Sequence, residues 1–184
     1  QQATSTQTLG MRLDGERVLS TDWKLLYTAE YAKQTPYADG ASSIDNHYSR
    51  IGAGARHGNW FARIDQEVLS SNGAKAFQTP LATLHKFNGW ADLFLNTPGT
   101  GLEAKYVTLA KVFPAVKALP GLNAAVTYHQ FDSDVGNVNF GHEWDASVGF
   151  KVRKVALLAK YADYKAIGFG TSTKKFWLQA EFAF

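Results

Sequence analysis

Hydrophobic and polar side chains alternate along most of this chain with the period of two that a β-strand imposes. In the C-terminal segment, Phe176, Leu178 and Phe182 fall on one face, whereas Gln179 and Glu181 fall on the other. Comparable alternation marks the segments 4–13, 22–33, 47–56, 60–69, 102–113, 122–131, 142–151 and 154–164. The pattern predicts about nine strands, each near the roughly 9–11 residues that cross a bilayer at a tilt.

The connections between these segments alternate in length. The shorter ones are residues 14–21, 56–59, 114–121 and 152–153. The longer ones, rich in Gly, Asn, Asp and Ser, are residues 34–46, 70–101, 132–141 and 165–172. Outer-membrane barrels have short periplasmic turns and long external loops, so the pattern predicts an all-β fold, an antiparallel transmembrane β-barrel in the bacterial outer membrane. The alternative, a soluble sandwich or lipocalin-like barrel, leaves the charges on the second face of the strands unexplained.

The parity of the strands bears on whether this chain closes a barrel alone. Bacterial single-chain barrels have an even number of strands, yet counting back from a periplasmic C-terminus makes the first strand here run inward from outside. We therefore expect residues 1–184 to be the C-terminal part of a larger barrel of about 18 strands. An N-terminal barrel segment or a second chain would complete the wall. The alternative is a strand missed within residues 73–83, which gives a small filled barrel of roughly eight or ten strands.

Composition excludes several classes of protein. The chain has no Cys, so disulfide and thiolate chemistry are absent. Its formal net charge of +3 comes without a basic run, and we expect no nucleic-acid partner. No stretch approaches the roughly 18 uninterrupted apolar residues of a membrane-spanning helix. Residues 1–4 lack the basic start of a signal peptide, so we expect a mature chain or the interior of a longer precursor.

Several segments carry a resemblance to a known family. They are residues 6–13, 26–34, 77–85, 87–92 and 160–164, and the most specific is Phe87-Asn88-Gly89-Trp90-Ala91-Asp92. Together they are similar to the C-terminal half of the bacterial alginate-export family of outer-membrane channels. The resemblance implies a large monomeric barrel whose basic lumen passes an anionic polysaccharide.

The charged face of the predicted strands supplies candidate solute-binding residues. The basic residues expected to point inward are Arg12, Lys24, Arg50, Arg63, Lys105, Lys111, Lys151, Lys160 and Lys175. Charges on the inner wall of a barrel face water, and rings of basic groups favour anions. Acidic residues are expected on the same face: Glu30, Asp65, Glu67, Glu103, Glu143, Asp145 and Glu181. They leave a second interpretation open, in which paired charges form a ladder of salt bridges that stiffens the wall.

The segment 70–101 is too long to be a plain connection. Its many apolar side chains would be costly in water, so we expect it to fold into or over the lumen and to constrict or gate the pore. The candidate gating residues are Phe87, Trp90, Asp92 and Phe94. The alternative is a loop that packs on the rim of the barrel.

These features predict an outer-membrane channel, or porin, through which anionic saccharides or small acidic solutes diffuse. A structural or scaffold barrel plugged by its own loop is the alternative. The expected partners are outer-membrane lipid, the segment that completes the wall and an anionic solute.

Catalytic and metal-binding patterns are weak. An outer-membrane lipid hydrolase would need a paired Ser and His, for which His129 with Ser133, or Ser147 with His142, are the available pairs. No His pair has zinc-ligand spacing, and the acidic residues from position 132 onward depart from a calcium loop. We therefore expect no enzyme, no catalytic residue, no metal and no cofactor.

Overall fold

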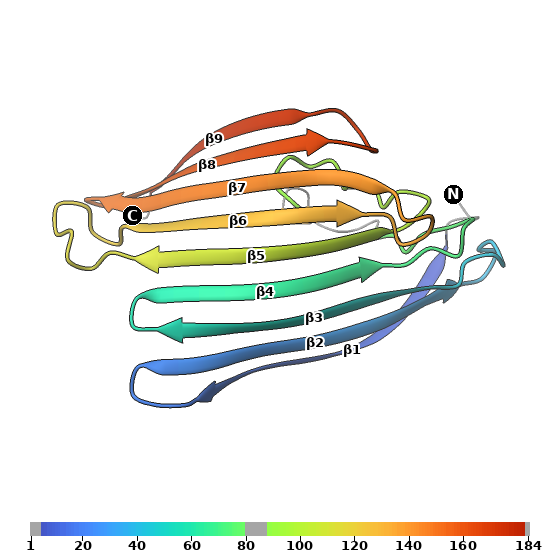
Figure 1. Ribbon diagram of the computed structural model, residues 1–184, viewed down its shortest axis with the longest axis horizontal. Coiled ribbons are helices and arrows are strands. Elements are labelled where there is room, and N and C mark those ends of the chain that lie inside the picture. The colour runs from blue at the N-terminus through green and yellow to red at the C-terminus, as the bar shows by residue number, and fades with distance from the viewer. Residues whose placement is uncertain (1–4, 80–87, 183–184) are drawn as a thin grey trace.

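Nine strands form a single antiparallel sheet. The computed structural model describes residues 5–79 and 88–182. The strands are β1 (Thr6–Val18), β2 (Trp23–Pro36), β3 (Asn46–His57), β4 (Trp60–Leu69), β5 (Leu102–Val112), β6 (Asn123–Asp132), β7 (Asn139–Val152), β8 (Val155–Ala166) and β9 (Thr173–Phe182). Each strand pairs with its neighbours in the chain, in the order β1 to β9 (Figure 1). The predicted all-β antiparallel fold is confirmed. Within the same residues, no helix has the length and apolarity needed to span a membrane.

The sheet has two edges, which are β1 and β9. Figure 1 shows these strands at opposite margins of a curved sheet. Because successive strands alternate in direction, β1 and β9 run the same way, and joining them would require a parallel pair in an otherwise antiparallel sheet. The described chain is therefore a curved wall with two free margins.

Tight turns lie at one end of the sheet. Only residues 58–59 separate β3 from β4, and only residues 153–154 separate β7 from β8. Gly58 has φ of 53° and Arg153 has φ of 54°, in the left-handed region that two-residue hairpins favour. The connection 70–101 lies at the opposite end. The predicted alternation of short and long connections holds only up to β5, because residues 113–122 between β5 and β6 outnumber residues 133–138 and residues 167–172 at the other end.

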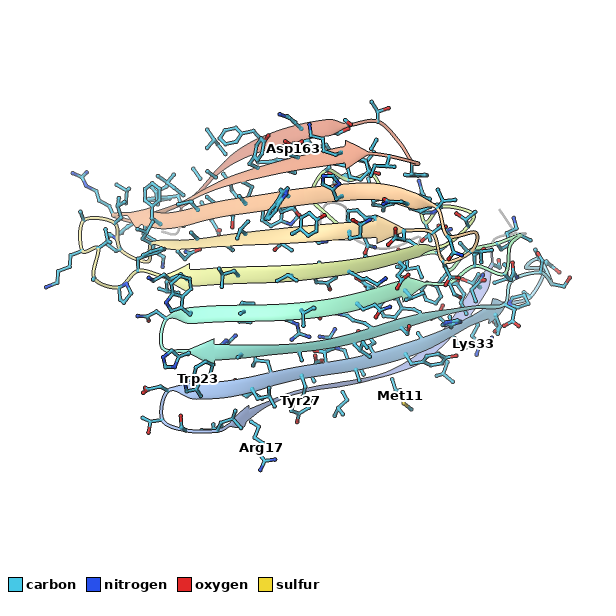
Figure 2. All side chains as sticks on the ribbon, in the orientation of Figure 1. Met11, Arg17, Trp23, Tyr27, Lys33 and Asp163 are labelled. Atoms are coloured by element: carbon cyan, nitrogen blue, oxygen red, sulfur yellow. The ribbon has the colours of Figure 1, made fainter. Side chains whose placement is uncertain are left out.

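The pleat gives the sheet two chemically different faces. We call the face against which the loop 70–101 packs the inward face, and the other the outward face. Leu9, Met11 and Leu178 on the outward face keep 76%, 77% and 76% of their surface exposed. Met11, Trp23 and Tyr27 of this exposed set are labelled in Figure 2. An apolar surface that continues over all the strands is typical of a sheet that contacts lipid.

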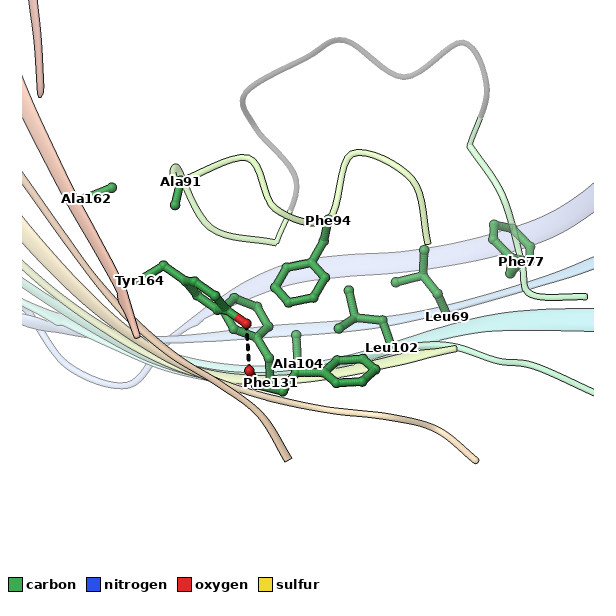
Figure 3. Packing of buried hydrophobic residues seen from close by; sticks show 10 residues of the cluster. Leu69, Phe77, Ala91, Phe94, Leu102, Ala104, Phe131, Ala162 and Tyr164 are labelled. Carbon is green, nitrogen blue, oxygen red and sulfur yellow. Dashed lines mark hydrogen bonds between the residues drawn. The ribbon is translucent and has the colours of Figure 1, made fainter. Parts of the chain in front are cut away.

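The loop 70–101 closes a hydrophobic core on the inward face. The cluster consists of Leu69, Phe77, Ala91, Phe94, Leu102, Ala104, Phe131, Phe140, Ala162 and Tyr164. Figure 3 shows Ala91 and Phe94 of the loop on the same side of the sheet as Tyr164 and Phe131. The ring centroid of Phe94 lies 4.6 Å from that of Phe131 and 5.9 Å from that of Tyr164. The Tyr164 hydroxyl donates a 2.6 Å hydrogen bond to the Phe140 carbonyl. The core thus joins the loop to strands β4 to β8.

We predict that Phe94→Ala destabilises the protein far more than Leu95→Ala. Phe94 is 3% exposed among aromatic rings, whereas Leu95, the next residue, is 38% exposed. Emptying the Phe94 site should lower the free energy of unfolding by about 3 kcal/mol. The control should change it by less than about 1 kcal/mol. Urea unfolding in detergent, followed by tryptophan fluorescence, measures both values, and equal losses would contradict the assigned core.

Candidate functional site

The strand register divides the predicted solute-binding residues between the two faces. Arg63 pairs with Thr108, and Asp65 pairs with Tyr106, so Thr108 and Tyr106 share the inward face with them. Lys105, which neighbours Tyr106, therefore lies on the outward face. Lys111 and Glu103 follow the same alternation. The prediction that Lys105, Lys111 and Glu103 point inward is wrong. The register places the other predicted bases on the inward face: Arg12, Lys24, Arg50, Arg63, Lys151, Lys160 and Lys175.

The exception in β5 has a physical cause. The loop covers the inward side of this strand, where Leu102 and Ala104 are 0% exposed. Apolar residues are therefore required on a face that is polar in most other strands. The outward charges lie near the strand ends, where Lys105 pairs with Glu103 at 3.0 Å and Lys111 lies 4.2 Å from the centroid of the Trp60 ring. Long cationic side chains near a membrane boundary can extend to water.

Two arginines on the inward face share one carboxylate. Arg50 on β3 donates to Asp65 Oδ1 from Nε at 3.2 Å and from Nη2 at 3.0 Å. Arg63 Nε donates to Asp65 Oδ2 at 2.7 Å. A Cβ at Gly52 would overlap the Asp65 carboxylate, so the absence of a side chain there gives this group room. The Asp65 side chain is 1% exposed, while Arg50 and Arg63 are 23% and 15% exposed. Within these three side chains the arginines carry one positive charge more than Asp65 balances, while Glu30 and Glu67 lie opposite Arg50 on the neighbouring strands.

The predicted inward bases of the first two strands, Arg12 and Lys24, are paired. Arg12 contacts Asp14 and lies 3.4 Å from Glu30. Lys24 Nζ lies 2.7 Å from Glu16 Oε1. The predicted first strand ends at residue 13 and is followed by a connection of residues 14–21, whereas β1 continues to Val18. Asp14 and Glu16 were missed for that reason. The continued alternation Arg12, Asp14, Glu16 is the signal that identifies them.

Arg56 is a further inward base that sequence reasoning missed. It was assigned to a turn, whereas β3 extends to His57 and pairs Arg56 with Phe61. The Arg56 guanidinium carbon lies 5.6 Å from the centroid of the Phe61 ring. Its separation of six positions from Arg50 places it on the same face of the strand.

The loop is bound to β7 through its own backbone. The amide of Ala91 donates to Glu143 Oε1 at 2.7 Å, and the amide of Trp90 donates to Asp145 Oδ2 at 3.3 Å. Asn88 and Gly89 have φ of 54° and 90°, a conformation that turns successive N–H groups toward an anion. Glu143 is 0% exposed. A buried carboxylate without such donors would be strongly unfavourable, so the wall and the loop stabilise each other.

Side chains add further contacts between loop and wall. Lys175 Nζ on β9 lies 2.7 Å from Asp92 Oδ2. Lys160 Nζ on β8 lies 4.1 Å from the centroid of the Trp90 ring. The structure thus brings the predicted gating residues Trp90, Asp92 and Phe94 together against the inward face, whereas Phe87 lies outside the described residues. Lys160 and Lys175, predicted to bind solute, contact the loop. Lys151 is exposed at the end of β7.

The candidate catalytic pairs do not form a reactive site. His142 and Ser147 lie on opposite faces of β7, because they are five residues apart in one strand. His129 Nε2 lies 3.3 Å from Asp145 Oδ2, and Ser133 Oγ accepts a hydrogen bond from the amide of Val138 at 2.8 Å. Residues 5–79 and 88–182 contain no group of three His, Cys, Asp or Glu side chains placed to bind a metal ion.

Comparison with solved structures identifies the fold. Acinetobacter baumannii OccAB4 matches with a TM-score of 0.72 and 16% identity, over 97% of this chain and 46% of that chain. Pseudomonas aeruginosa OpdL matches with a TM-score of 0.70 and 17% identity, over 98% of this chain and 53% of that chain. Acinetobacter baumannii OccAB3 matches with a TM-score of 0.70 and 13% identity, over 97% of this chain and 48% of that chain.

These matched structures are outer-membrane porins. The chain therefore has the fold of an outer-membrane porin barrel and spans about half the length of the porins it matches. No protein-family model matches the sequence, and no curated protein sequence is similar to it. The comparisons support an outer-membrane β-barrel without singling out the alginate-export family.

We predict that Gly89→Ala loosens the loop while Gly99→Ala does not. A Cβ at Gly89 would lie 2.6 Å from Glu143 Oε2, and the φ of 90° disfavours a side chain. A Cβ at Gly99 would meet no atom within 4 Å. Hydrogen exchange measured by mass spectrometry should show at least about tenfold faster exchange of the Trp90 and Ala91 amides in Gly89→Ala, which corresponds to roughly 1.4 kcal/mol. Unchanged exchange in that variant would show that the contact with Glu143 does not fix the loop.

Proposed function

We propose that this chain is part of an outer-membrane channel through which small acidic solutes or anionic saccharides diffuse. The observation that carries the proposal is the group of Arg50 and Arg63 around the single carboxylate of Asp65, on the inward wall of a porin fold. A segment preceding β1, or a second chain, would complete the wall. The proposal involves no catalytic step.

The chemistry of the arginine group suits a carboxylate-bearing solute. Asp65 compensates one of the two guanidinium charges and is itself buried, so a solute would meet the arginines first. Arg63 Nη2 is buried and has no hydrogen-bond partner among the described residues, so a solute would meet the exposed parts of Arg50 and Arg63 instead. A guanidinium group can bind a carboxylate through two parallel N–H donors, which fixes orientation as well as charge. Arg12, on the neighbouring part of the same face, would extend the positive surface along the path of the solute.

The loop would set the width of the path. Its polar anchors include Glu143, Asp145 and Lys175 on β7 and β9, and Gln34 on β2, which exchanges two hydrogen bonds with the Gln78 backbone. The arginines belong to β1, β3 and β4. A solute would pass between the loop and the arginine-bearing strands. In this proposal Trp90, Asp92 and Phe94 hold the loop in place, and the loop constricts the pore.

A structural barrel plugged by its own loop is the second candidate. The observation that favours it is the pairing of inward charges, such as Lys24 with Glu16 and Arg12 with Asp14. Such pairs stiffen a wall without selecting a solute. Single-channel recording of the complete barrel separates the candidates, because a plugged barrel carries no stepwise current.

We predict that removing two inward arginine charges lowers anion selectivity. The test variant is Arg12→Gln with Arg50→Gln, in which Asp65 keeps Arg63 as a partner. Two charges about 8 Å from a solute in water contribute roughly 1 kcal/mol, so the permeability ratio of chloride to potassium should fall about fivefold. Reversal potentials across a planar bilayer with a KCl gradient measure this ratio.

The matched control for this experiment removes two outward charges. Lys111→Gln with Lys174→Gln changes the net charge by the same amount on the opposite face. Its reversal potential should stay at the wild-type value. Equal shifts in both double variants would mean that net charge, and not the inward arginine group, determines selectivity, and the proposed function would be wrong.

A further inference from the structure

An apolar groove lies on the outward face across β3 to β6. It has a volume of about 570 Å³, and its apolar lining comes from Ile51, Ala53, Ile64, Val107 and Tyr128. This volume lies within the roughly 300–1,000 Å³ of sites that bind small molecules. Ile51 and Ile64 are 61% and 60% exposed, so the chain itself does not cover the groove.

A row of polar side chains forms one end of this groove. Gln66 pairs with Lys105 across β4 and β5, and Lys105 pairs with Gln130 across β5 and β6. All three line the groove. The next row toward the tight turns is Ile64, Val107 and Tyr128. The groove is therefore apolar along its length and carries a cation at the end nearer the long loops.

The charge at this end is available to a ligand. The Lys105 side chain is 52% exposed, and its contact is with Glu103 at 3.0 Å. Glu103 also accepts a 2.6 Å hydrogen bond from Gln66. Glu103 pairs across the strands with Asp132, in the next outward row toward the long loops. Two charged residues line the groove: Lys105, whose side chain lies on the outward face, and Asp65, whose buried side chain lies on the inward face. An exposed pair such as Lys105 with Glu103 contributes little stability, so a phosphate can share the ammonium group.

We infer that this groove binds one acyl chain of a phosphate-bearing membrane lipid, whose headgroup phosphate contacts Lys105. The inference rests on the membrane placement in the proposed function, because only then does the outward face meet lipid. Apolar side chains match the acyl chain, and the ammonium group matches the phosphate at the water boundary. The amide side chains of Gln66 and Gln130 flank that phosphate.

Native mass spectrometry of the protein in detergent, with lipid A added as the probe, tests this inference. The wild-type protein should retain lipid A, and Lys105→Gln should reduce the bound fraction about fivefold, as expected for the loss of one cation near a phosphate. Ala53→Phe, which places a ring in the groove, should also reduce it. Fully dephosphorylated lipid A should bind wild type and Lys105→Gln equally.

Two control variants share the strand and face of the test residues but lie outside the groove. Lys111→Gln is the control for Lys105→Gln, and Ala55→Phe is the control for Ala53→Phe. Both should retain lipid A at the wild-type level. The inference is wrong if Lys105→Gln or Ala53→Phe binds lipid A as the wild type does, or if the controls lose it equally. Lipid binding is measured without any ionic current. If lipid A binds as expected but the arginine variants do not change ion selectivity, the proposed channel function is wrong and the lipid site stands.

Discussion

The alternation of side chains across the pleat is the constraint on which the rest of the structure depends. Every strand presents one face to each side, and in this sheet the two sides have opposite chemistry. Leu9 and Met11 are largely exposed on the outward face, whereas Arg12, between Met11 and Leu13, pairs with Asp14 on the inward face. A shift of one residue in any pairing would exchange these environments along a whole strand. The antiparallel register is therefore fixed by the different environments of the inward and outward faces, as well as by backbone hydrogen bonds.

The inward face has to accommodate the loop, and this requirement modifies the alternation locally. Residues beneath the loop are apolar at Leu102 and Ala104, and acidic at Glu143, which receives a loop amide. A segment with little secondary structure must find acceptors for its amides elsewhere, and buried carboxylates need donors. The amide of Ala91 gains an acceptor, and Glu143 Oε1 gains a donor. The loop is attached to β7 and β9 through Glu143 and Lys175, and to β2 through two hydrogen bonds between Gln34 and the Gln78 backbone. None of these anchors uses the arginine group on β3 and β4.

Much of the fold was predictable from the sequence because alternation is a local signal. The strands, the two-residue turns and the long connection 70–101 all followed from neighbouring residues. The faces of β5 did not, because Lys105 and Glu103 appear inward if polarity alone decides, and only the cover provided by the distant loop reverses that assignment. The contact between Ala91 and Glu143 joins a backbone amide to a side chain 52 positions away, and no residue type encodes it. The inward position of Asp14 could have been predicted from the sequence, because the alternation continues through it.

In the proposed channel, selectivity would have to come from the arrangement of the charges, because acids accompany bases along the inward face. Glu16 with Lys24 is a nearly balanced pair that gives no lasting preference for an anion. Asp65 differs because it is buried between two guanidinium groups. Its charge fixes the arginines in place while their outer atoms remain accessible, so positive charge is concentrated where a solute would meet the wall. Gly52 makes this possible by leaving space for Asp65. In the proposed channel, this small residue on β3 would determine where the wall recognises a carboxylate.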